Sequence, residues 1–229
     1  MRSNAKSNDT LSVQNRYNYY KIQPGDVIDI KVSSLDPQSV AIFNKNVGVN
    51  QTNQVNDASI YLNGYSIDDS GYVSLPIIGK ILVKDLEVPQ VKTVIENKMK
   101  SYYKFSSVDI KLMNFRVTIV GEVNAQGSYP VYRDQANILQ LIGMAGGFTD
   151  VADKKKIKII RKEDNVSKMF YINLGDSKII GSEDYYMQPN DVVYVEPLRA
   201  KALKVNAPTI QLALSALTFI IVITNLLSR

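Results

Sequence analysis

The sequence contains no cysteine, no histidine and no tryptophan among its 229 residues. Without cysteine the chain has no disulfides, no thiolate nucleophile and no Cys/His zinc site, and without histidine it has no imidazole acid–base chemistry. We therefore expect no catalytic, cofactor-binding or metal site. Any enzymatic activity would have to come from carboxylates. The absence of cysteine fits any redox compartment.

Charge is moderate and dispersed. The formal net charge is +5, and 45% apolar with 21% charged residues is the composition of a folded chain. Basic residues gather only at 154–156, 161–162 and 199–204, so we favour ordinary solvated faces and expect no nucleic-acid partner. Residues 1–19 are polar and lack the apolar core of a signal peptide. We therefore expect either a cytosolic chain or one whose export signal has been removed or replaced, and the sequence leaves both open.

The first part of the sequence predicts strands with one covering helix. Residues 20–32 indicate a turn at Pro-Gly and then a strand, because apolar and polar residues alternate. Residues 36–66 predict mostly loop, and residues 70–83 predict short strands broken by Pro and Gly. Residues 88–103 have the apolar spacing of an amphipathic helix of about 14 residues. A further alternating strand follows at 107–112.

The second part repeats this plan. Residues 115–132 predict a strand, a Gly-containing turn and another strand. Residues 137–147 predict a short helix that ends in two glycines suited to its C-cap. Further strands are expected at 155–161, 167–173 and 191–197. A sheet with one helix across it is the economical arrangement.

Two stretches echo each other. Gln-Pro-Gly-Asp-Val at 23–27 recurs as Gln-Pro-Asn-Asp-Val at 188–192, each leading into an apolar strand. Gly and Asn are the residues that best tolerate positive φ in such a turn. Because this turn chemistry is common, two five-residue matches do not establish a duplication.

Taken together, several motifs resemble the Wza-type outer-membrane polysaccharide export family. The stretch IQPGDVIDIKV resembles its opening signature, and residues 67–112 resemble the body of its export domain. Residues 117–161 resemble a soluble-ligand-binding β-grasp domain, whose usual end is similar to MQPNDVVYVEP at 187–197. The motifs occur in the expected order over most of the chain.

The resemblance implies a non-enzymatic, ring-forming protein of the outer membrane of a Gram-negative bacterium, with its main body in the periplasm. It implies a homo-oligomer of about eight copies, polysaccharide as the transported substrate, and an inner-membrane polysaccharide co-polymerase as partner. Family members commonly carry a lipid on an N-terminal cysteine, which this chain lacks.

We therefore expect an α+β fold with two β-rich units followed by a C-terminal transmembrane amphipathic helix. The expected organisation is a flexible segment at 1–19, an export domain at 20–115, a β-grasp domain at 116–197, and a basic linker with the transmembrane helix at 198–229.

Other candidate chemistry has a plainer explanation. Asp26, Asp29, Asp68, Asp69 and Glu122 could be imagined as paired carboxylates for glycoside cleavage, but several sit in ordinary turn sequences, so we favour structural roles. The Gly-rich stretch at 143–147 lies at a helix end, which disfavours an anion. The chain has 14 tyrosines. For those at 17, 19, 20, 102 and 103 we favour packing over contact with sugar or a neighbouring subunit.

The chain ends in an uncharged apolar run. Residues 208–227 as a helix would reach roughly 30 Å, about one hydrocarbon thickness. At 100° per residue the polar side chains fall within a sector of about 80°; they are Gln211, Ser215, Thr218 and Asn225. We expect these four to line a wet lumen, and we expect three basic residues to meet outer-membrane lipid at the membrane–water boundary; these are Arg199, Lys201 and Lys204.

Three function classes remain open from the residues alone. The first is an oligomeric conduit that exports capsular or exopolysaccharide through an α-helical barrel. The second is a tail-anchored periplasmic ligand-binding module without a pore, and the third is a polysaccharide-modifying enzyme that would depend on carboxylates. A ring would favour the conduit, and saturable sugar binding by a monomer would favour the binding module. The enzyme would require turnover.

Overall fold

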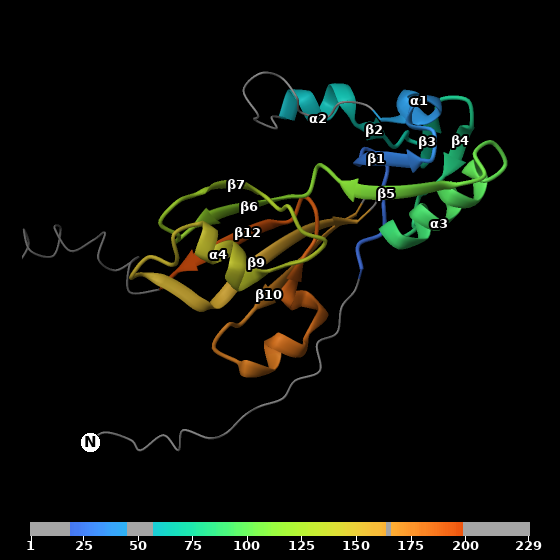
Figure 1. Ribbon diagram of the computed structural model, residues 1–229. Coiled ribbons are helices and arrows are strands. Elements are labelled where there is room, and N and C mark those ends of the chain that lie inside the picture. Colours follow the sequence, from blue (N-terminus) through green and yellow to red (C-terminus); the bar gives the residue numbers. More distant parts are fainter. Residues whose placement is uncertain (1–18, 45–56, 164–165, 199–229) are drawn as a thin grey trace, which may run out of the picture.

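The computed structural model describes residues 19–44, 57–163 and 166–198. They form an α+β fold with two hydrophobic cores, which Figure 1 shows as neighbouring lobes. Leu112, at the end of the strand that leads from one core to the other, packs against both. The fold class expected for the folded part of the chain is therefore confirmed.

The first core combines a three-stranded sheet, a hairpin and one long helix. The sheet has the order β2-β1-β5, with both pairs antiparallel, and β3 pairs with β4 in the hairpin. The elements are β1 (Val27–Ser34), α1 (Pro37–Val40), η1 (Ala41–Phe43), α2 (Asp57–Asn63), β2 (Tyr65–Ser66), β3 (Tyr72–Leu75), β4 (Gly79–Leu82), α3 (Val88–Met99) and β5 (Ser106–Leu112).

Helix α3 illustrates how the sequence produces this core. Gln90 reaches back and accepts a hydrogen bond from the Glu87 backbone N–H at 2.9 Å, which satisfies one donor at the helix start. Val91, Ile95 and Met99, one turn apart, are fully buried. The expected helix is confirmed and has 12 residues.

The expectation of mostly loop at residues 36–66 is wrong for its described ends. Helix α1, η1, α2 and β2 lie there, and Asp36 caps α1 by accepting from the Gln38 N–H at 3.1 Å. These elements span at most seven residues, too few to display a helical or strand period. Residues 45–56 lie outside the described part of the chain.

The second core is a five-stranded sheet with a short helix. Its strand order is β10-β9-β12-β6-β7, antiparallel except for the parallel pair β12–β6. A small ladder joins β8 to β11. The elements are β6 (Arg116–Gly121), β7 (Gly127–Pro130), β8 (Ala136–Asn137), α4 (Ile138–Met144), β9 (Ala152–Glu163), β10 (Val166–Ile172), η2 (Ser177–Gly181), η3 (Glu183–Tyr185), β11 (Tyr186–Met187) and β12 (Val192–Pro197).

Helix α4 covers one face of this sheet. Asn137 and Gln140 form a reciprocal capping box at its start. At its end, Gly146 and Gly147 have φ of 73° and 86°, and the Gly147 N–H donates to the Ile142 carbonyl. The expected C-cap is confirmed, so these glycines end the helix.

Within the described residues, none of the helices is long and apolar enough to cross a membrane. The expected C-terminal helix falls at residues 199–229, which lie outside that part of the chain.

Candidate functional site at the junction of the two cores

The two echoing turns meet at the junction between the cores. Residues from both line one groove of ≈ 650 Å³. Gly25 has a φ of 87° and Asn190, at the matching position, has a φ of 66°. The sequence echo is thus also an echo of backbone conformation, and the tolerance of Gly and Asn for positive φ explains why these residues occupy it.

Each turn is closed by its own aspartate in the same way. The Gln23 N–H donates to Asp26 Oδ2 at 2.8 Å, and the Gln188 N–H donates to Asp191 Oδ2 at 2.8 Å. The aspartate N–H returns a bond to the glutamine carbonyl, at 3.1 Å in the first turn and 3.2 Å in the second. The carboxylate therefore serves as the fixed centre of both turns.

Asp26 is buried and has partners beyond its own turn. The Tyr20 hydroxyl donates to Asp26 Oδ2 at 2.8 Å, and Asn114 Nδ2 donates to Oδ1 at 3.3 Å. Burial raises the pKa of Asp26, although these hydrogen bonds act to lower it. Burial, and then the charge of Asp26, also raise the pKa of Tyr20, so its hydroxyl stays a donor at neutral pH.

The carboxylate of Asp191 forms an ion pair with Arg161. Arg161 Nε and Nη2 donate to its carboxylate at 3.0 and 2.7 Å, and Asp191 is completely buried. Arg161 Nη2 also donates to the Tyr186 carbonyl at 3.2 Å, and the guanidinium lies 5.3 Å from the centroid of the Phe170 ring. A bidentate pair with these added contacts is the arrangement in which a buried charge is tolerated.

Residues 113–115 form the connector between β5 and β6, and hydrogen bonds from both turns hold its two ends. The Met113 N–H donates to the Val27 carbonyl at 2.8 Å, and the Val27 N–H donates to Asn114 Oδ1 at 3.2 Å. On the other side, the Asn190 N–H donates to the Arg116 carbonyl at 2.8 Å. The first turn therefore hydrogen-bonds to the start of the connector, and the second turn hydrogen-bonds to the residue that follows it. Together they fix the path of the chain from one core to the other.

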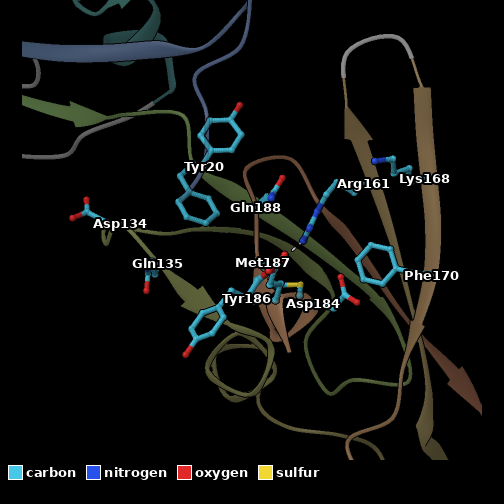
Figure 2. A pocket seen from close by; sticks show the side chains of 12 residues that line it. Tyr20, Asp134, Gln135, Arg161, Lys168, Phe170, Asp184, Tyr186, Met187 and Gln188 are labelled. Carbon is cyan, nitrogen blue, oxygen red and sulfur yellow. Dashed lines mark hydrogen bonds between the residues drawn. The ribbon is translucent and has the colours of Figure 1, made fainter. Parts of the chain in front are cut away.

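A second hollow, of ≈ 390 Å³, lies next to the groove and shares Tyr20 with it. Figure 2 shows Arg161 and Phe170 on its sheet side, with Tyr20 on the opposite side. The lining residues are Tyr20, Phe115, Asp134, Gln135, Arg161, Lys168, Phe170, Glu183, Asp184, Tyr186, Met187 and Gln188.

This lining suits a hydroxyl-rich ligand. Aromatic rings offer flat apolar faces, while carboxylates, amides and a lysine offer acceptors and donors around them. Asp134, Glu183 and Asp184 are exposed at the rim, whereas Arg161 is already committed to Asp191. The hollow can therefore bind the edges and faces of a sugar ring.

Four of the five carboxylates considered for catalysis have structural partners, and the fifth, Asp69, lines the larger groove. Asp68 accepts from the Ser70 and Tyr72 N–H groups, which holds the pKa of its exposed carboxyl below the usual value. Glu122 accepts from the Thr149 hydroxyl at 2.8 Å. Asp29 lies 3.9 Å from the Lys31 ammonium, and Asp26 closes its turn.

The tyrosines differ in environment. Tyr20 lines both hollows, and Tyr103 packs edge-on against Phe43 with ring centroids 5.7 Å apart. Tyr19 and Tyr102 are about half exposed. Of the described tyrosines considered from the sequence, Tyr20 is thus the one that lines a hollow, and Tyr186 joins it in the smaller one.

The described residues contain no group of three or more Asp, Glu, His or Cys side chains that could hold a metal ion. The pore-lining and membrane-interface residues expected from the sequence lie outside the described part of the chain; they are Gln211, Ser215, Thr218, Asn225, Arg199, Lys201 and Lys204.

Comparison with known families decides the kind of protein to which this junction belongs. The sequence matches the family described as polysaccharide biosynthesis/export protein over residues 14–113, and the SLBB domain over residues 116–172. The chain belongs to the polysaccharide biosynthesis/export family. This export-family protein carries the domain pair of Wza-type polysaccharide export proteins, so the resemblance stated above is confirmed. The family is one of exporters of the Gram-negative envelope, implies a polysaccharide substrate and is not an enzyme family.

Sequence reasoning located the turns but missed how the junction is assembled. Asp26 and Asp191 stood in the echo, whereas Arg161 was placed only in a basic cluster and Tyr20 was assigned to packing. The echo was the available signal, because a repeated Asp after a turn indicates a repeated structural task. Asn114 and Arg161 come from segments 88 and 30 residues away, and Tyr20, six residues before Asp26, carries no turn or strand pattern that marks it as a partner.

Proposed function

We propose that this chain is a subunit of a ring-forming outer-membrane translocon, which exports capsular or exopolysaccharide from the periplasm to the cell surface. In this proposal the export domain (20–115) and the β-grasp domain (116–197) form the periplasmic body. Residues 198–229 supply a basic linker and a helix, and copies of this helix form an α-helical barrel.

One observation carries the proposal: the export and SLBB matches are followed by an uncharged run with a polar stripe. A single copy offers a polar glycan no water-lined path across a bilayer. Copies related by rotation place the stripes around one axis and leave no unfinished edge. Gln211 and Asn225 are costly to expose to lipid, which favours an inward orientation.

The family resemblance supplies further elements of the proposal. It favours about eight copies per ring, an assignment that rotational symmetry by itself leaves open. It also favours an inner-membrane polysaccharide co-polymerase as the partner on the periplasmic side. Outer-membrane lipid would surround the barrel.

Native mass spectrometry of the detergent-extracted full-length chain tests the ring. We expect one discrete high-order species and little monomer. A spectrum that contains monomer alone would refute the conduit.

The junction hollow favours a second candidate, a tail-anchored periplasmic module that binds a glycan without forming a pore. Its aromatic and carboxylate lining suits sugar, and sugar binding would not require a ring. Saturable oligosaccharide binding by a stable monomer would support this candidate over the conduit.

A further inference from the structure

The five-stranded sheet has a second face, opposite α4, whose residues are exposed or partly exposed in the described part of the chain. Because side chains alternate along a strand, the residues between the buried ones point to this side. The strand register aligns them in two rows across β10, β9 and β12. We call this surface the sheet face; it comprises Met169, Ile160 and Val192 in one row and Tyr171, Lys158 and Tyr194 in the other.

The sheet face is apolar and aromatic in a way that free surfaces usually are not. Met169 and Tyr171 are 60% and 57% exposed, and Ile160 is 37% exposed. Contiguous exposed apolar side chains of this kind mark contact surfaces. In a layered fold, such a face is normally covered by a helix.

Its one central charge is already neutralised and held in place. The Lys158 ammonium lies 5.5 Å from the Tyr171 ring centroid, 5.4 Å from that of Tyr194 and 3.4 Å from Glu196 Oε1. A lysine fixed between two rings loses little further side-chain freedom when another surface packs over it. This row is therefore preorganised for contact.

The other side of the same unit carries a second exposed apolar surface. Helix α4 turns Ile138, Leu141 and Ile142 into the core, whereas Leu139 and Met144 are 46% and 51% exposed. We call the outer side of α4 the helix face; it comprises Leu139, Gln140, Gly143 and Met144, none of them charged.

Charges around the two faces are complementary. Alternation along β9 places the exposed Lys156 and Lys162 on the side of the sheet face. The β8–β11 ladder brings η3, with the exposed Glu183 and Asp184, beside the first turn of α4. Asp134, also exposed, precedes the same helix. Exposed lysines thus lie at the margin of the sheet face and exposed carboxylates at the margin of the helix face, where Lys168 lines the hollow with Glu183 and Asp184.

We infer that the helix face of one copy packs on the sheet face of the next copy. The two surfaces lie on opposite sides of one unit, are both apolar and carry opposite charge at their margins, which is what a heterologous contact requires. Each copy offers one surface to each neighbour, so the contact repeats until the rotation closes. This inference rests on the proposed ring and names the surfaces that build it.

Cross-linking of the full-length chain in detergent tests the contact, because the chain has no native cysteine. Leu139→Cys and Met169→Cys are introduced together and treated with a bis-maleimide. We expect a ladder of covalent oligomers, since each copy links to both neighbours. Leu139 and Met169 lie on opposite sides of the sheet, so linkage within one chain is blocked. Each single variant should stay monomeric on a denaturing gel, because a heterologous contact does not bring identical residues together.

Matched variants separate a specific contact from general effects. Tyr61→Cys combined with Met169→Cys should give no ladder, although Tyr61 is 75% exposed. Ile160→Glu should shift the native mass from ring to monomer. Leu82→Glu, at an exposed strand position of the first core, should leave the ring intact.

The outcomes distinguish this inference from the ring itself. A ring in the native mass spectrum without a cross-linked ladder would overturn the assigned surfaces and leave the ring standing. Monomer alone for the unmutated chain would remove both proposals. A dimer from the single Met169→Cys variant would indicate a two-fold contact and overturn the heterologous one. Protection of Met169→Cys from maleimide in dissociated monomer would assign the sheet face to residues of its own chain.

Discussion

Arg161 donates through Nε and Nη2 to the carboxylate of Asp191, and the two side chains form a bidentate ion pair inside the second unit. Arg161 is 7% exposed and Asp191 is completely buried. The pair closes the turn at 188–192, and that turn holds the start of β6 through the Arg116 carbonyl. The ion pair thus determines how the connector enters the sheet.

Breaking this pair from one side should be costly. Arg161→Met leaves the Asp191 carboxylate buried without its partner, and we expect a loss of about 3–5 kcal/mol in the free energy of unfolding. Urea denaturation of Arg161→Met, of Asp191→Asn and of the double variant that combines them measures the coupling energy of the pair. The double variant should lose less than the sum of the single variants; strict additivity would mean that the pair does not act as a unit.

Asp26 should make stability depend on pH in a recognisable direction. Its pKa is raised in the folded state, so the stability it contributes is present below its unfolded value of 3.8 and is lost as pH rises through the folded pKa. Asp26→Asn lacks this titration. The stability of the wild-type chain relative to the variant should therefore fall from pH 3.5 to pH 7, measured by urea denaturation; a constant difference would contradict the raised pKa.

Gly25 should be required for its backbone conformation alone. A methyl group at Gly25 would meet no atom within 4 Å, but φ is 87°. Gly25→Ala should therefore cost about 1–2 kcal/mol, the penalty for left-handed backbone in an L-residue. Gly127→Ala is the matched control, because Gly127 also has open space and no positive φ is recorded for it. Equal thermal stability of the two variants would show that this conformation is not strained.

The basic residues before the apolar run should act at the lipid surface. Reversal of charge at Arg199, Lys201 and Lys204 should weaken membrane association and assembly, since each basic residue near anionic headgroups contributes on the order of 1 kcal/mol. Membrane flotation measures the association. Replacement of the three residues with glutamine should give an intermediate loss, and unchanged flotation of the reversed variant would remove the interface assignment.

Much of the fold could be predicted because its main elements are long enough to show a period. Strand β5 alternates between buried and more exposed residues along its length. Helix α3 places Val91, Ile95 and Met99 one turn apart on its buried side. Helix α2 was missed because its seven residues are too few to show a helical period. The β8–β11 ladder was missed because a two-residue strand contains no period.

The junction could be predicted only in part. Turn composition predicted positive φ at Gly25 and Asn190, since that preference is local. Asn114 and Arg161 reach the turns through tertiary packing, across separations of 88 and 30 residues. Such convergence depends on how the strands order in space, which local patterns do not encode.

Single cysteines along residues 211–225 test the central claim most directly, because the chain has no native cysteine to interfere. They are labelled in intact outer membranes with a charged, water-soluble thiol reagent, with Leu212→Cys and Phe219→Cys as off-stripe controls. The proposed conduit predicts that labelling peaks at 211, 215, 218 and 225 and is low at the controls. Uniform protection at those four positions would contradict a water-filled lumen lined by this helix.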